Sequence, residues 1–440
     1  MLSALIRSAA GAGLSSAAMV LRDLFMANEL GISSAVDAYI IVYTFVMFVA
    51  AVLAASMSAA LTPAFMRQRA AAGENLALAL AWHSGVRLCA GMVVVALVIV
   101  GASDLILSVV ASNLSPDTRA LARVALLWMA GLLPLHAIAV VLAVIANAHG
   151  AFVRPGLALA MPPLFASIAL ILAGPQGAVA ALAIGTVLGT VVQLACFPFE
   201  WTQLLGRRSR ERVATGALRH LLSQYLPVVA GAVLMSATPL IDQAMAATLA
   251  GGSIATLSYG QKLPALILMI SALALSTAVL PHLSEMVANE DWVGMRDTVR
   301  VVRRLIVIVF VPLTVVLIAA SRPLAALVFE RGAFTAAAVT PVSLVQSALL
   351  LQVPFFLVGT LYVRLISALG RNSILLWGTV ISLCVKVGCN LLLMRWLGVT
   401  GLALSTSIVY VVACIYLTLQ ARRAAAQRIA GTGLVEARSS

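Results

Sequence analysis

The sequence predicts an all-α polytopic membrane protein of about twelve transmembrane helices, arranged as two parallel six-helix repeats. The first observation is composition: of 440 residues, 62% are apolar and only 10% are charged, whereas soluble domains are about half apolar and about a quarter charged. The second is a series of long uncharged segments, and the third is a set of motifs that recur about 220 residues apart. The composition excludes a set of soluble globular domains.

Charges and clusters of Gly, Pro, Asn and Asp separate the apolar segments and mark the expected helix ends. A helix needs about 20 residues to cross the hydrocarbon core of a bilayer. The 45 uncharged residues between Arg154 and Glu200 therefore hold two helices, divided by the turn residues 174–177. The expected helices span 4–28, 38–66, 78–110, 119–147, 153–173, 177–203, 221–249, 256–286, 302–320, 339–369, 373–394 and 400–421.

The loops on the two sides of these helices differ in their basic residues. The loops on one side, together with the tail after Gln420, contain 17 Lys and Arg residues. The loops on the other side contain four, namely Arg119, Arg322, Arg331 and Arg395. Because short basic loops stay in the cytoplasm, we expect both termini there, in agreement with an even number of helices.

The longest connection lies at the middle of the chain and is rich in arginine. We expect it to be a basic cytoplasmic linker over 206–220 between two six-helix bundles, which cover 1–205 and 221–422. A cytoplasmic tail is expected over 423–440. Because each half has an even number of helices, both halves enter the membrane in the same direction, as in transporters that hold substrate between two parallel repeats.

The two halves share short motifs at a nearly constant offset. Residues 23–27 (DLFMA) align with 242–246 (DQAMA), and Tyr39 aligns with Tyr259. Further matches join 58–63 (SAALTP) with 276–281 (STAVLP), Arg87 with Arg304, and 148–150 with 368–370. Together they predict a duplicated unit and direct attention to the seam between the halves.

Ionisable side chains inside the expected helices are the candidate functional residues, because each costs roughly 2.5–3.5 kcal/mol to insert and usually faces a partner or a wet cavity. We expect four to bind substrate and two to couple an ion or line the cavity. The substrate-binding set is Arg22, Asp37, Lys262 and Arg364, and the second set is Asp23 and Asp242.

Structural interpretations of these residues stay open. Arg22 and Lys262 lie near helix ends, where long basic side chains extend to the lipid head groups. Asp23 and Asp242 also fit acids near water at helix ends. Arg364, and with it Lys386, fits an anchor between helices or at the membrane interface.

The remaining composition predicts no metal, cofactor or nucleic-acid partner. The net charge is +13, but the basic residues stand singly or in short clusters between apolar segments, whereas nucleic-acid-binding proteins gather them on one polar face. The five cysteines fall within apolar segments, and neither they nor the five histidines show a metal-ligand spacing. No catalytic residues are expected, because a membrane enzyme needs its acids or a His/Arg set in a sizeable external loop, and the outward loops expected here are short.

Several motifs resemble one family of membrane transporters. Residues 21–27 (LRDLFMA), 30–31 (LG), 37–39 (DAY) and 58–63 (SAALTP) resemble the opening of the MurJ (MviN) lipid II flippases, of the multidrug/oligosaccharidyl-lipid/polysaccharide exporter superfamily. Residues 259–263 (YGQKL), 280–284 (LPHLS) and 329–335 (FERGAFT) resemble later segments of that family.

The resemblance implies a V-shaped MATE/MurJ-like transporter in the bacterial cytoplasmic (inner) membrane. Such a protein moves a polyprenyl-diphosphate-linked glycan, foremost the peptidoglycan precursor lipid II, across that membrane by alternating access. The implied partners are this lipid-linked substrate, membrane lipids, and cell-wall or polysaccharide assembly proteins. No cofactor is implied, and the coupling is to H⁺, Na⁺ or the membrane potential.

By position in the motifs, the resemblance assigns the diphosphate contacts to Arg22 and Lys262 and the acid that opens the second helix to Asp37. Two departures from the family pattern bear on the substrate. The basic pair and acid of the second helix fall on Ala50–Ala55, which are all apolar, and a further arginine of the first helix is replaced near Ser16. The family also has fourteen helices where twelve are expected here.

Other functions stay open beside lipid II flipping. One is a flippase for another lipid-linked oligosaccharide, such as an exopolysaccharide or O-antigen unit, which the missing basic residues favour. A second is an H⁺- or Na⁺-coupled exporter of small molecules, with Asp23, Asp37 or Asp242 binding the ion. A membrane enzyme, or a partner protein that has lost transport, fits less well.

Overall fold

The structure is a computed structural model that describes residues 2–439 except 113, 207–214 and 290. Within its helices, the described side chains exclude those of residues 2–10, 12, 215–220, 234–235, 273–274, 276–281, 284, 287–288, 372 and 424–439. Every regular element in the described residues is a helix, as expected for an all-α protein. The chain forms two compact units: unit 1 is Met1–Ala255 with Arg331–Thr335, and unit 2 is Thr256–Glu330 with Ala336–Ser440.

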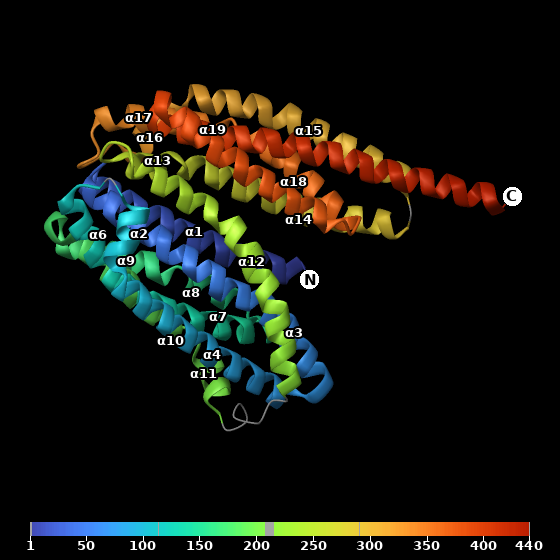
Figure 1. Cartoon of the computed structure of the whole chain (residues 1–440), viewed down its shortest axis with the longest axis horizontal. Coiled ribbons are helices and arrows are strands. Elements are labelled where there is room, and N and C mark those ends of the chain that lie inside the picture. Colours follow the sequence, from blue (N-terminus) through green and yellow to red (C-terminus); the bar gives the residue numbers. More distant parts are fainter. Residues whose placement is uncertain (1, 113, 207–214, 290, 440) are drawn as a thin grey trace. The chain divides into compact units, whose positions relative to one another are not determined.

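Unit 1 contains helices α1 to α12 (Figure 1). Their bounds are α1 Leu2–Leu30, α2 Ser34–Ala50, the π-helical segment η1 Ala51–Ala55, α3 Ser56–Ala72, α4 Glu74–Gly101, α5 Ser103–Val110, α6 Pro116–Met129, α7 Leu132–Ala148, α8 Val153–Ala158, α9 Met161–Ala173, the single turn η2 Pro175–Gly177, α10 Ala178–Ala195, α11 Pro198–Leu205 and α12 Thr215–Ala246.

Helix α13 (Ser253–Gly260) begins in unit 1 and ends in unit 2, which contains the remaining helices. They are α14 Lys262–Ala288, α15 Trp292–Ala319, α16 Ser321–Phe329, α17 Ala336–Leu350, α18 Val353–Ala368 and α19 Asn372–Ser439. The long helix α19 is broken at Gly398, whose φ of 54° and ψ of −132° are not helical. It therefore consists of two arms.

The helices follow the expected spans in order. In the described residues, nine helical segments are long and apolar enough to cross a membrane. The last, Ser373–Arg423, covers two expected spans, 373–394 and 400–421, on either side of Gly398. The expected spans 4–28 and 256–286 are helical as α1 and as α13 with α14, although neither is among the nine.

Local sequence explains where several helices begin. The Ser33 side chain accepts a hydrogen bond from the backbone N–H of Val36 at the start of α2. The Ser115 side chain likewise accepts a hydrogen bond from the backbone N–H of Thr118 at the start of α6. Pro116 occupies the first position of α6, where a proline removes no intrahelical hydrogen bond. These side chains satisfy N–H groups that the first helical turn leaves without a partner.

The expected start of the span at 302 was wrong, because α15 begins ten residues earlier, at Trp292. Asp291 caps this helix by accepting a hydrogen bond of 2.8 Å from the backbone N–H of Gly294. The arginines before residue 302 form a polar stretch, which is typical of a loop in a sequence of this kind. The structure shows that the helix continues through this stretch.

Helices α9 and α10 approach each other closely through two glycines one turn apart. A Cβ atom added at Gly185 would lie 2.6 Å from the carbonyl oxygen of Phe165, and one at Gly189 would lie 2.5 Å from Cα of Pro162. Small residues at this spacing allow two membrane helices to pack backbone against backbone. This contact fixes α10, and with it Thr186, in unit 1.

The short segment Arg331–Thr335 belongs to unit 1 although its neighbours belong to unit 2. The backbone N–H of Ala333 donates to the carbonyl oxygen of Asn28 at 2.7 Å, which ties the segment to the end of α1. Gly332 has a positive φ of 56°, and a Cβ there would lie 2.3 Å from the Asn28 carbonyl oxygen. Only glycine fits this approach without strain.

The apolar core of unit 2 is built where α18 packs against α14, α15 and α19. Leu283, Leu361 and Ile366 are fully buried in this cluster. Figure 1 shows α15, α18 and α19 running along one another within unit 2.

The expected division into bundles at 1–205 and 221–422 stays a prediction. In the compact units, α12 lies with the N-terminal helices and packs against α2 and α3. Residues 207–214 of the expected linker and the side chains beyond 423 of the expected tail lie outside the described residues.

Candidate functional site

A buried arginine on α1 of unit 1 is the first part of the candidate site. Arg22 on α1 is 6% exposed, and its neighbour Asp23 is 4% exposed. Nε and Nη2 of Arg22 donate to Oδ1 of Asp23 at 3.1 and 2.8 Å. Arg22 therefore does not extend to the lipid head groups from this position, and its charge is balanced inside the unit.

Two tyrosines of α2 complete the surroundings of this guanidinium group. Nη1 of Arg22 donates to the hydroxyl of Tyr39 at 3.4 Å. The guanidinium carbon lies 4.7 Å from the ring centroid of Tyr43 and 5.7 Å from that of Tyr39. A cation over an aromatic face is stabilised by the ring quadrupole, and the effect grows when water is excluded.

Helix α10 contributes the last member of this cluster. The hydroxyl groups of Tyr39 and Thr186 lie 3.2 Å apart and share a hydrogen bond. Thr186 also donates to the carbonyl oxygen of Leu182 at 2.6 Å, so the proton that joins the two hydroxyls comes from Tyr39. Arg22, Asp23, Tyr39, Tyr43 and Thr186, here called the Arg22 cluster, thus join three helices.

Asp37, expected to bind substrate, makes a different contact in the structure. Its side chain is buried, and its Oδ2 and Oδ1 accept hydrogen bonds from the backbone N–H groups of Gly252 and Ala255 at 2.6 and 2.7 Å. Both bonds lie at the start of α13, where helical N–H groups need acceptors. Asp37 therefore caps α13 in this structure.

The other expected site residues are half-buried and lie in both units. Asp242 is on α12 in unit 1, whereas Lys262 opens α14 and Arg364 lies on α18, both in unit 2. Helices α14 and α18 pack against each other. Of the six expected site residues, the structure thus brings Arg22 and Asp23 into contact. The binding roles of all six stay predictions.

Sequence reasoning missed Tyr39, Tyr43 and Thr186 as members of the site. Tyr39 and Tyr43 are spaced by four residues, so they lie on one face of α2 and stack with ring centroids 5.7 Å apart. That spacing in an otherwise aliphatic segment was an available signal. Thr186 carried none, because threonines that bond to their own helix are common in membrane spans.

Lys386 is the second buried cation and lies on the first arm of α19. It is 1% exposed, and its Nζ donates to the side chains of Ser405 and Thr406 at 3.1 and 2.5 Å. Both hydroxyls lie on the second arm, beyond Gly398. The interpretation of Lys386 as an anchor between helices is confirmed.

Among the described residues, no three His, Cys, Asp or Glu side chains gather as a group that could hold a metal ion.

The sequence is similar to a family of known proteins over nearly its whole length. A family model described as lipid II flippase MurJ matches residues 26–439. A protein of Thermotoga maritima named probable lipid II flippase MurJ is 26% identical over 414 residues, which cover 91% of this chain and 81% of that protein.

Two further relatives with the same name match over shorter segments. The Rickettsia prowazekii protein is 29% identical over 36% of this chain, and the Helicobacter pylori protein (strain 26695) is 30% identical over 43% of it. The chain spans 31% and 41% of the length of these two proteins in the matched segments.

Two solved structures share the fold. A lipid II flippase MurJ in an inward closed conformation aligns with a TM-score of 0.81 and 20% identity, over 96% of this chain and 90% of that one. An inward-facing multidrug resistance MATE family transporter aligns with a TM-score of 0.77 and 16% identity, over 94% and 95% of the two chains. At these identities the alignments establish the transporter fold.

Proposed function

The chain belongs to the MurJ family of lipid II flippases, and from this premise we propose that it carries a polyprenyl-diphosphate-linked glycan across the bacterial cytoplasmic membrane by alternating access. Lipid II, the peptidoglycan precursor, is the first substrate to test. The protein acts as a transporter and not as an enzyme. In this proposal both termini are cytoplasmic.

The observation that carries the proposal is the buried guanidinium group of Arg22. Moving a diphosphate through hydrocarbon unaided is prohibitive, because an ionised group loses its hydration there. An arginine offers five N–H donors in a planar fork that fits phosphate oxygens, and contacts within the described residues use three of those of Arg22. The remaining N–H groups can donate to a phosphate, and so can the N–H group that makes the long bond to Tyr39.

Each of the other expected residues has a role in this proposal. Lys262 provides a compact positive charge for the diphosphate, and Arg364 a second fork. Asp37 acts as a positioning residue, because its hydrogen bonds fix the start of α13. Asp23 and Asp242 balance charge in the cavity and couple transport to H⁺, Na⁺ or the membrane potential.

A second substrate class deserves a test because of the π-helical segment Ala51–Ala55. The resemblance places the family's basic pair and acid here, but this chain has only apolar side chains in the segment. A head group that needs fewer cationic contacts, such as another lipid-linked oligosaccharide unit, fits that difference. Such a substrate would pass through the same fold by the same mechanism.

Complementation tests the proposal. In cells depleted of their lipid II flippase, we expect the wild-type protein to restore growth and outer-leaflet lipid II, and Arg22→Ala and Lys262→Ala to fail. Arg87→Ala is the matched control, because Arg87 is exposed on α4 and bonds only to its own helix among the described residues. Rescue by both site variants would contradict the assigned roles.

Complementation of a second bacterial strain, which lacks an oligosaccharide flippase, distinguishes the two substrate classes. If the wild-type protein rescues cells that lack an oligosaccharide flippase and not those that lack the lipid II flippase, the lipid II assignment is wrong. Gradient-driven dye efflux from vesicles without any rescue would instead identify a small-molecule exporter.

A further inference from the structure

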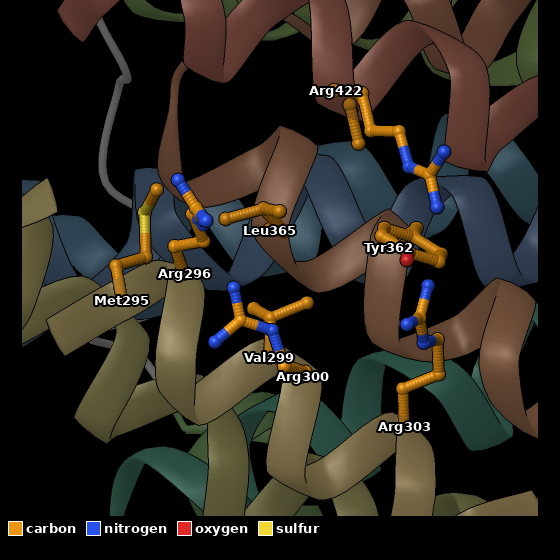
Figure 2. Close-up of a pocket in the computed structure, with 9 residues that line it drawn as sticks. Met295, Arg296, Val299, Arg300, Arg303, Tyr362, Leu365 and Arg422 are labelled. Atoms are coloured by element: carbon orange, nitrogen blue, oxygen red, sulfur yellow. The ribbon is translucent and has the colours of Figure 1, made fainter. Parts of the chain in front are cut away.

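A pocket of about 330 Å³ lies in unit 2, between α15, α18 and α19. Four arginines line it: Arg296, Arg300 and Arg303 from α15, and Arg422 from the second arm of α19. Tyr362 and Leu365 of α18 also line the pocket. Figure 2 shows the side chains of Arg303 and Arg422 approaching Tyr362 from the two different helices.

The three arginines of α15 reach one pocket because of their spacing. Positions 296, 300 and 303 are separated by four and three residues, and residues at these intervals lie on one face of a helix. Arg304, directly after Arg303, lies on another face and is exposed. The pocket therefore depends on α15 being helical from Trp292 onward.

Most of the positive charge in this pocket has no balancing partner in the part of the chain that the structure describes. Arg300 pairs with Asp297 at 2.5 Å, and both side chains of that pair are more than half exposed. The guanidinium groups of Arg296, Arg303 and Arg422 have no hydrogen-bond or ion-pair partner among the described residues. Several guanidinium groups around one space favour an anion with several oxygens, and a phosphate accepts such bonds from several directions.

The surface beside the pocket indicates where an anion for this pocket would come from. From Val301 onward, α15 presents exposed apolar side chains, with Val301, Leu305 and Ile308 each at least 60% exposed. The segment Trp292–Ala319 is long and apolar enough to cross a membrane. The pocket thus lies where an apolar, lipid-facing surface gives way to charge, which is the depth of the phospholipid head groups.

We propose that this arginine pocket binds the phosphate of an anionic membrane phospholipid. The head group enters between Arg303, Arg422 and Tyr362, and the acyl chains lie along the apolar face of α15. Basic pockets between transmembrane helices bind anionic head groups in this way. All lining residues belong to unit 2, so the proposal is independent of the substrate site around Arg22.

The test measures lipid binding to the full chain in nanodiscs by native mass spectrometry. The probes are phosphatidylglycerol, phosphatidylcholine as the neutral lipid, and soluble glycerol phosphate. We compare the wild type with Arg303→Ala/Arg422→Ala. The matched control, Arg304→Ala/Arg423→Ala, removes the same charge from neighbouring exposed positions that do not line the pocket.

We expect the wild type and the control to retain phosphatidylglycerol over phosphatidylcholine equally. Arg303→Ala/Arg422→Ala should lose about 25-fold in phosphatidylglycerol affinity, at roughly fivefold for each basic side chain. Equal loss in both double variants, or none in either, would overturn the pocket as the site. Tight binding of glycerol phosphate would overturn a lipid as its source. Thermal unfolding of each variant shows whether it folds. If the alanine variant does not fold, Arg303→Lys/Arg422→Lys, which keeps the charge but removes the guanidinium groups, replaces it in the binding measurement.

Discussion

At the scale of single residues, the Arg22 cluster shows how one charge is kept inside a membrane protein. Asp23 neutralises the guanidinium group, and Tyr39 and Tyr43 cover it. Removing one partner of a buried ion pair costs more than removing both, because the remaining charge is left without compensation. The cluster is thus sensitive to single changes and tolerant of paired ones.

Asp23→Ala should therefore destabilise the protein by roughly 3–5 kcal/mol, while Arg22→Met/Asp23→Leu should unfold close to the wild-type temperature. Thermal unfolding of the purified protein in detergent checks both values. Asp104→Ala is the control, because its pair with Arg123 is exposed and such pairs contribute about 0–1 kcal/mol. An Asp23→Ala protein as stable as this control would show that the pair does not matter to folding.

The sequence predicted that Arg22 and Asp23 matter, because ionised groups are rare in apolar helices. It could not predict that Asp23 pairs with its direct neighbour, nor that Tyr43 lies over the cation. Those contacts depend on how α1 packs near α2 and α10, which no local pattern determines.

At the scale of elements, Asp37 links two helices that are far apart in sequence. Its carboxylate joins the start of α2 to the start of α13 across more than 200 residues. Hydrogen bonds to a charged acceptor contribute about 1.5–3 kcal/mol each. The position of the start of α13 therefore depends on one buried side chain.

Asp37→Ala should lower the stability clearly, and Asp37→Asn less, since the amide keeps one acceptor oxygen. Asp117→Ala, at an exposed position in the first turn of α6, should cost at most about 1 kcal/mol. Denaturation and transport are measured on the same variants. If Asp37→Asn folds like the wild type but does not transport, the acid contacts substrate directly and the capping account is incomplete.

Glycine contacts between α9 and α10 give a second prediction at this scale. Gly189→Ala places a methyl group against the backbone of α9, and such overpacking costs about 1–3 kcal/mol. Gly91→Ala is the control, because a Cβ there meets nothing within 4 Å and alanine favours the helix. The two unfolding temperatures should move in opposite directions; a shift of both in the same direction would contradict the close packing.

Hydropathy predicted the order of the helices better than their ends. Spans such as 153–173 match the observed segment closely, because turn residues stand at both ends. The expected start at 302 misses the start of α15 by ten residues, because Arg296 and Arg300 stand before the apolar segment and are typical of a loop. In fact they form one polar face of a helix that extends beyond the apolar segment.

At the scale of the whole molecule, each of the two compact units contains a buried cation with polar partners. Arg22 lies in unit 1, and Lys386 lies in unit 2 with hydroxyl partners from the other arm of α19. The sequence repeat predicted duplicated halves with charge in both. It could not predict that α12 packs with the N-terminal helices, since the motifs around Asp23 and Asp242 compare positions in sequence only.

The central claim, that Arg22 serves a lipid-linked diphosphate, is tested most directly by lipid II translocation in proteoliposomes. Labelled lipid II is placed in one leaflet, and its accessibility on the other side is followed over time. We predict translocation by the wild type and none by Arg22→Met/Asp23→Leu, although that variant folds. Equal translocation by both proteins, or none by the wild type, would contradict the account.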